Sequence, residues 1–268
     1  MTMTVGCGRL QWILQRFEDT EKLAEALDRL GFRYTWHKVI PFVGQLDPEP
    51  EVTDPNSVIL FGSYSLWRTA FERGWLPGVF QLAPFIKQDA WRPYLLNGEV
   101  RQFTVRQVAE LQADETLHFV RPVSDSKEIA GAVMSTSEII EMAQKVLGLT
   151  EDEIPRGSLS HDTELLLASP VKIFKEWRCW VVGEEVVTWS LYKEGSRVVY
   201  RQEMDDDALA FVRQMVSINS GYSPAYVIDI CRTENGLKII ETNCMNAAGF
   251  YAADLMKLAV ALDGLNFV

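Results

Sequence analysis

The sequence predicts an α/β protein whose C-terminal part is α+β, and two patterns carry this prediction. In the first hundred residues, short apolar runs alternate with amphipathic helical patterns, which indicates βαβ units around a small parallel sheet. From Leu165 onward, β-branched and aromatic runs are joined by glycine-containing turns, which is typical of antiparallel hairpins. The 268 residues are 47% hydrophobic and 24% charged, a globular balance that excludes disordered and collagen-like classes.

The N-terminal elements follow from local signals. Apolar residues recur at helical spacing from Leu23 to Leu30, which predicts a helix there. We expect Gly31 to end this helix and Asp19 or Thr20 to cap its start. The elements expected in this part are strands over 10–14, 32–40 and 57–61, a helix over 19–30, and a second helix opened by Gly62 and Ser63.

The middle of the chain begins with an irregular, proline-containing stretch over 74–97. Such a stretch predicts a connector or a ligand-facing loop. Three regular elements follow it, and Ser135 or Ser137 is the expected cap of the last one. These elements are a helix over 104–113, a strand over 118–122 and an amphipathic helix over 135–147.

The C-terminal elements are two hairpins and two helices. Asn235-Gly236 is a strong turn signal between two apolar strands, and Gly183 opens the turn of the other hairpin. An acidic first turn favours a helix from Asp205, because carboxylates stabilise the positive end of a helix dipole. The expected elements are strands over 171–182, 186–192, 226–231 and 237–242, and helices over 205–217 and 251–262.

Charge and composition exclude several classes of function. The chain has 26 Lys and Arg against 37 Asp and Glu, a formal net charge of −11. Such a chain repels phosphate backbones and anionic lipids, and no basic patch is visible, so we expect neither nucleic-acid nor membrane partners. The 4 cysteines form no CxxC pair, and no signal-peptide pattern or apolar run of about 18 residues occurs, which predicts a cytoplasmic protein.

Three candidate metal ligands lie on the C-terminal hairpin. Strand alternation puts Glu241 and Asn243 on one face, and Asp229 can lie opposite them on the partner strand. Two carboxylates and an amide oxygen form the hard-oxygen set that Mg²⁺ prefers, and an otherwise apolar hairpin holds two acids more readily with a cation. A surface hairpin with one polar face is the alternative, and the spacing leaves both interpretations open.

Two further segments carry cations beside apolar strands. Glu176 and Arg178 share one face of a strand, so Arg178 is a candidate phosphate or carboxylate clamp, with an intrastrand ion pair as the alternative. Arg121 ends another strand, and Lys127 lies in the loop after it. Together these two cations can hold a polyphosphate from two sides, although this signal is weak by itself.

In this order and spacing, the three segments resemble the ATP-grasp superfamily over about residues 104–260. The resemblance implies that Arg121 and Lys127 contact the phosphates of ATP. It also implies that the backbone of Val171-Lys172-Ile173 binds adenine at a hinge, with Glu176 on the nucleotide side of the following strand. Arg178 is then expected to face the transferred phosphate or the substrate carboxylate. An arginine at the first cation position resembles an arginine-bearing clade of bacterial and phage ATP-grasp proteins.

The resemblance further implies that Asp229, Glu241 and Asn243 hold Mg²⁺ and that ATP is the nucleotide. It implies an ATP-grasp fold preceded by a small N-terminal βαβ domain. The expected domains are 1–103 and 104–268, the second divided into a lid subdomain over 104–169 and a metal-binding subdomain over 170–268. Arg178 and Arg121 are the expected catalytic residues.

The activity implied by the resemblance is an ADP-forming carboxylate–amine ligase. ATP would phosphorylate a carboxylate, and an amine would displace the acyl phosphate. The expected substrate is an amino acid, a peptide or a related small molecule, with a homodimer as the candidate assembly. A phosphotransferase at the same nucleotide site and a non-catalytic nucleotide-binding module are the alternatives, and product analysis separates the three.

Overall fold

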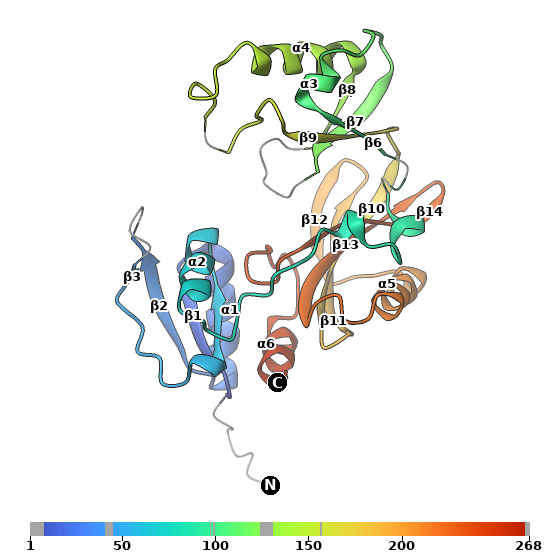
Figure 1. The fold of residues 1–268 in the computed structure, drawn as a ribbon. Helices are drawn as coiled ribbons and strands as arrows, with labels where there is room; N and C mark the ends of the chain where they lie inside the picture. Colours follow the sequence, from blue (N-terminus) through green and yellow to red (C-terminus); the bar gives the residue numbers. More distant parts are fainter. Residues whose placement is uncertain are drawn as a thin grey trace. The chain divides into compact units, whose positions relative to one another are not determined.

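Parallel and antiparallel sheets occupy different parts of the chain. The computed structural model describes residues 8–40, 45–96, 98, 100–123, 131–155 and 157–265. Two compact units are present: the first combines residues 1–94 with 173–268, and the second comprises residues 95–172 (Figure 1). The α/β class is confirmed, while the predicted domain limits at 103 and 104 remain a prediction.

The N-terminal sheet of the first unit has the strand order β3-β2-β1-β4-β5. Strand β1 lies at its centre and runs parallel to both β2 and β4. Strand β4 is wholly apolar and buried, as expected of a parallel strand covered on both faces. The elements are β1 (Gln11–Gln15), α1 (Glu18–Leu30), β2 (Tyr34–Val39), β3 (Leu46–Asp47), β4 (Val58–Phe61), α2 (Tyr64–Glu72) and β5 (Pro77–Gly78).

Helix α1 confirms one of its predicted ends and corrects the other. Gly31 ends the helix with φ 71°, a left-handed conformation that glycine adopts without steric cost. The start is Glu18, with Phe17 in the cap position, so neither Asp19 nor Thr20 is the cap. Thr20 Oγ1 instead accepts from Phe17 N at 2.9 Å and donates to Gln15 O at 2.6 Å, which ties the first turn to the end of β1.

The second sheet of this unit is antiparallel and has the order β12-β11-β10-β13-β14. Its inner residues, among them Trp180 and Val227, share one hydrophobic core with Trp12 and Leu14 of the N-terminal sheet. The two sheets are thereby held in one unit. The elements are β10 (Ile173–Val182), β11 (Glu185–Glu194), β12 (Arg197–Arg201), α5 (Asp206–Ile218), β13 (Ala225–Thr233), β14 (Gly236–Asn243) and α6 (Leu255–Gly264).

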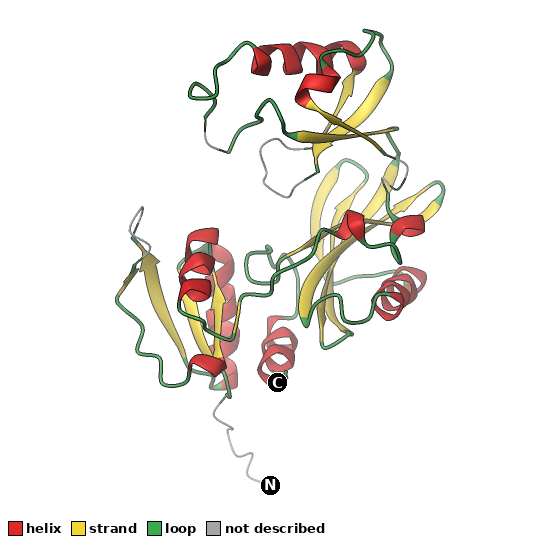
Figure 2. Cartoon of the chain, viewed as in Figure 1, coloured by secondary structure: helices red, strands yellow, loops and turns green. Residues whose placement is uncertain are grey.

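The second unit is a four-stranded antiparallel sheet, of order β6-β9-β7-β8, with α3 and α4 over it (Figure 2). Val120, Leu165 and Leu167 of the sheet pack with Val105, Ile139 and other apolar residues of the two helices. The elements are β6 (Arg101–Thr104), α3 (Val105–Val108), β7 (Leu117–Pro122), β8 (Ala132–Ser135), α4 (Thr136–Leu147) and β9 (Glu164–Ala168).

Several predicted boundaries are corrected. The helix expected over 104–113 is one turn, because Asp114 beyond it accepts from Thr116 N and Ser137 N and turns the chain toward β7. The last helix begins at Leu255 rather than 251, since Asp254 caps it. Strands β6, β8 and β12 were not predicted. In the described part of the chain, no helix combines the length and the apolar character needed to cross a bilayer.

Candidate active site on the antiparallel sheet

A buried ion pair lies at the centre of the antiparallel sheet. Arg178 of β10 and Asp229 of β13 are direct cross-strand neighbours. Arg178 Nε donates to Asp229 Oδ1 at 2.9 Å, and Nη2 donates to Oδ2 at 2.7 Å. The two side chains are only 10% and 2% exposed. The pair is therefore a bidentate, charge-assisted contact shielded from solvent, and the partner of Arg178 is not Glu176, as the ion-pair alternative had it.

The two other predicted metal ligands lie beside this pair. Glu241 of β14 is directly opposite Asp229, and Asn243 follows on the same face. Asn243 Nδ2 donates to Glu241 Oε1 at 3.1 Å and lies 3.4 Å from Asp229 Oδ2. The structure thus brings Asp229, Glu241 and Asn243 together, as the alternation of the hairpin predicts.

The electrostatics of this cluster favour an additional cation. Burial raises the pKa of the Asp229 carboxyl above its ordinary value; Arg178 opposes the rise, and the charges of Glu241 and Glu176 add to it. Burial also works against the charged form of Arg178, but the Asp229 carboxylate outweighs it and raises the pKa of the guanidinium. The oxygen ligands fit Mg²⁺ in chemistry and in charge, although both Asp229 oxygens also accept from Arg178.

Glu176 has partners that the sequence did not reveal. Its carboxylate accepts from the Tyr192 hydroxyl at 2.7 Å and pairs with Lys193 Nζ at 2.8 Å. Counting outward from the hairpin turn in strict register puts Leu191 opposite Glu176, but two register shifts between β10 and β11 bring Lys193 there. Lys193 is thus a second cation of the site, and only the bulges identify it.

An aromatic cluster lines the guanidinium of Arg178. The centre of the Tyr251 ring lies 4.7 Å from Arg178 Cζ, and Tyr251 stacks on Tyr200 with ring centroids 4.9 Å apart. Tyr251 has φ 49°, an uncommon conformation for a residue other than glycine. Arg178 Nη1 reaches Gly249 O at 3.4 Å. The guanidinium is therefore fixed on three sides by Asp229, Tyr251 and the Gly249 backbone.

The remaining predicted site residues lie elsewhere. Ile173 is the first residue of β10, and the chain passes from the second unit to the first between Lys172 and Ile173, where the hinge is predicted. Val171 and Lys172 belong to the second unit, as does Arg121, which is the fifth residue of β7. Lys127 lies outside the described residues. The nucleotide contacts of all five remain a prediction.

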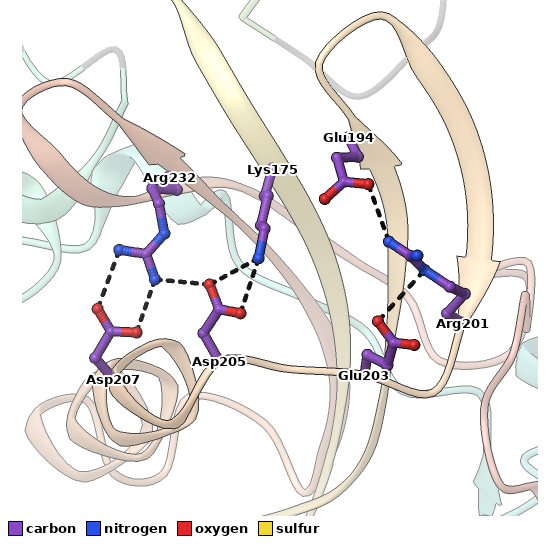
Figure 3. Close-up of polar contacts among 7 residues, drawn as sticks. All are labelled: Lys175, Glu194, Arg201, Glu203, Asp205, Asp207 and Arg232. Atoms are coloured by element: carbon purple, nitrogen blue, oxygen red, sulfur yellow. Dashed lines mark hydrogen bonds and ion pairs between the residues drawn. The ribbon is translucent and has the colours of Figure 1, made fainter.

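A second charged cluster occupies the other side of β10. Lys175 Nζ donates to Asp205 at 2.9 Å, and Arg232 bridges Asp205 and Asp207 at 3.0 and 2.7 Å. Figure 3 shows both cations directed at these two acids at the start of α5. Lys175 and Arg232 also lie 5.6 and 5.7 Å from the ring centre of the buried Trp177. Their charges are balanced within the cluster, so we assign it to fastening α5 on the sheet.

Comparisons with known proteins agree with this geometry. A family profile described as an ATP-grasp domain, the third family of its clade, matches residues 38–262. The solved structure of D-cycloserine synthetase DcsG is 13% identical, with a TM-score of 0.57, and the alignment covers 94% of this chain and 98% of that chain. No curated protein sequence matches the chain.

Two further solved structures have a similar fold. D-alanine–D-alanine ligase from Bacillus anthracis complexed with ATP is 12% identical, with a TM-score of 0.57, covering 96% of this chain and 92% of that chain. The ATP-grasp ligase PsnB complexed with a precursor peptide and AMPPNP is 15% identical, with a TM-score of 0.51 and 98% of each chain covered. At such low identity these structures establish the likeness of the fold alone.

Proposed function

We propose a function from one premise: this chain belongs to the ATP-grasp domain family whose profile it matches over residues 38–262. The ATP-grasp resemblance read from the sequence is thereby confirmed. The proposed function is that of an ATP-dependent, ADP-forming carboxylate–amine ligase. The observation that carries it is the buried Arg178–Asp229 pair with Glu241 and Asn243 beside it, because catalysis of phosphoryl transfer needs positioned charge more than a nucleophilic side chain.

The proposed reaction has two steps. A carboxylate oxygen of the substrate attacks the γ-phosphorus of ATP, the bond to the β-phosphate oxygen breaks, and ADP leaves. A neutral amine then attacks the acyl carbon, the bond from that carbon to the phosphate oxygen breaks, and inorganic phosphate leaves. The proton lost by the amine goes to solvent. The products are an amide, ADP and phosphate, so no redox partner is needed.

The residues have distinct proposed roles. Asp229, Glu241 and Asn243 would hold Mg²⁺, which supplies charge neutralisation at the nucleotide phosphates when it is bound. Arg178 uses Nε and Nη2 on Asp229, so its Nη1 edge is the part placed to contact a phosphate or carboxylate oxygen. Glu176 is fixed by Tyr192 and Lys193, which suits a carboxylate that orients a nucleotide hydroxyl.

The neighbours' names indicate the range of substrates. One is a D-cycloserine synthetase, one joins D-alanine to D-alanine, and one binds a precursor peptide. A small-molecule or peptide substrate is the corresponding proposal for this chain. The phosphotransferase and the non-catalytic module remain alternatives that the same assay distinguishes.

Product analysis with paired substrate pools tests the proposal. The protein is incubated with Mg²⁺ and ATP plus a pool of carboxylic acids, a pool of amines, or both, and ADP, phosphate and amide are quantified. A ligase releases ADP and phosphate, with an amide, when both pools are present. ADP with a phosphorylated hydroxyl compound and no free phosphate would instead identify a phosphotransferase, and nucleotide binding without turnover a non-catalytic module.

A further inference from the structure

A cavity of about 290 Å³ lies at the carboxyl ends of β1 and β4. From β1 the chain passes through α1 to β2 on one side, and β4 lies on the other side, so the connections diverge at this edge. In open sheets with parallel strands, ligands bind at the carboxyl edge where the strand order reverses. The cavity lies at that position and within a single unit of the chain.

The walls of the cavity are mainly aromatic and aliphatic. Phe61 and Phe250 are buried beneath it, whereas Phe17 and Tyr64 are 46% and 56% exposed. Large exposed aromatic side chains around a hollow lose water-accessible apolar surface when an apolar group enters. Pockets for drug-sized ligands measure about 300–1,000 Å³, so this cavity suits a single amino acid better than a long peptide.

The two ends of the cavity differ in charge. On one side, Asp19 belongs to the acidic first turn of α1, and its carboxylate is 43% exposed. On the other side, α2 begins at Tyr64 with no acidic residue in its first turn. Ser63 does not cap α2, since its Oγ donates to Gln15 Oε1 at 2.8 Å. This polarity orients a zwitterion, with its ammonium group at Asp19 and its carboxylate at the start of α2.

The acidic end of the cavity adjoins the Arg178 site. A Cβ atom added at Gly249 would lie 3.3 Å from Asp19 Oδ2 and 3.9 Å from Arg178 Nη1. The oxygen of the same glycine accepts from Arg178 Nη1. An amine held at Asp19 is therefore on the side of the cavity that faces the guanidinium of the candidate active site.

We propose that this cavity binds the amine acceptor and that the acceptor is an α-amino acid with an apolar or aromatic side chain. The inference rests on the proposed ligase function. The side chain lies among Phe17, Phe61, Tyr64 and Phe250, and the amino group lies at Asp19. Before attack, the bound ammonium releases one proton to solvent, and its nitrogen then forms the bond to the acyl carbon as phosphate leaves.

Calorimetric titration of DL-phenylalanine into the Mg²⁺·ADP-loaded protein tests this site. We expect Asp19→Asn to weaken phenylalanine binding by about tenfold or more, the usual effect of losing a hydrogen bond to a charged group. Glu18→Gln, which removes a charge from the same helical turn, leaves the affinity within about twofold. DL-phenylalaninamide and N-acetyl-DL-phenylalanine, which lack the carboxylate and the ammonium, bind more weakly than phenylalanine. Equal affinities in the Asp19 and Glu18 variants would overturn the proposal.

A second pair of variants tests the apolar wall without disturbing the core. Phe17→Ala is expected to weaken phenylalanine binding, whereas Phe71→Ala, a 74% exposed aromatic residue of α2 outside the cavity lining, leaves it unchanged. Mg²⁺·ADP affinity, measured in parallel, should be the same in all four variants. Turnover with amines while phenylalanine fails to bind contradicts the cavity alone. Phenylalanine binding without any ADP formation supports the cavity and contradicts the ligase.

Discussion

The Arg178–Asp229 pair is the residue contact on which the site depends most. Removing one partner of a buried pair leaves an uncompensated charge, so Arg178→Ala should lower the free energy of unfolding by about 3–5 kcal/mol. Arg178→Lys keeps the charge but loses the bidentate fork, so it should recover much of the stability but only part of the turnover. Urea denaturation and steady-state rates measure the two effects. Full turnover in both folded variants contradicts a catalytic role for Arg178.

Glu241 tests the metal assignment separately from stability. Glu241→Gln retains the shape of the side chain and leaves the Arg178–Asp229 pair in place, so the fold should persist. The Mg²⁺-dependent part of nucleotide binding should fall by about tenfold or more, because a carboxylate ligand is replaced by a neutral amide. Glu234→Gln in the turn of the same hairpin is the matched control. Titration of ADP with and without Mg²⁺ gives the comparison, and equal metal dependence in both variants excludes Glu241 as a ligand.

Asp205 gives a prediction for pH. Hydrogen bonds from Lys175, and then from Arg232, lower the pKa of Asp205 below its ordinary value. A lowered pKa in the folded state stabilises the protein above the unfolded-state pKa of about 4, and this contribution is lost as the pH falls through the folded value. Because Asp205 is 37% exposed, Asp205→Asn should cost only about 0.5–1 kcal/mol at pH 7.

The test compares unfolding free energies of Asp205→Asn and the native chain between pH 7 and pH 2. The difference should shrink to nothing at the acidic end, where the native carboxylate is also neutral. Asp206→Asn removes the same charge one residue later and serves as the control. A constant difference across this range contradicts the ion-pair assignment.

Among the elements, α4 has the most complete cap. Ser135 Oγ accepts from Glu138 N at 3.2 Å, and Glu138 Oε2 accepts from Ser135 N at 2.7 Å. Ser135→Ala should cost about 1 kcal/mol and should speed amide hydrogen exchange in the first turns of the helix. Ser137→Ala removes a hydroxyl outside the cap and is the control. Unchanged exchange in the Ser135 variant shows that the cap contributes nothing.

The elements also show how far sequence reasoning extends. The 226–243 hairpin was predictable because an Asn-Gly turn and strict alternation place Asp229 opposite Glu241 with no bulge between that pair and Asn243. Lys193 was not predictable, because bulges in β11 change the register and leave no local signal. The partner of Arg178 was misjudged for a related reason: strand order, which a single strand's sequence does not encode, puts β13 next to β10. The short strands β6, β8 and β12 lack enough residues for a clear alternation.

At the scale of the whole molecule, the first unit combines the two ends of the chain. Its two sheets share one core, and this places the cavity at β1 and β4 and the Arg178 site on the same structural unit. Phe250 and Gly249, which follow β14, contribute to the cavity and to the Arg178 site respectively. The account therefore assigns the acceptor and the metal ligands to one unit, with Arg121 as the described phosphate-binding candidate of the other.

The central claim is that ATP activates a carboxylate by phosphorylating it. The most direct measurement is the fate of oxygen-18 in a reaction whose carboxylate substrate carries the label in both carboxylate oxygens. Attack of that carboxylate on the γ-phosphorus, followed by amine attack on the acyl carbon, transfers one labelled oxygen into the released phosphate. The account predicts phosphate containing one oxygen-18 atom and an amide retaining the other. Unlabelled phosphate, formed by attack of water on ATP, would contradict it.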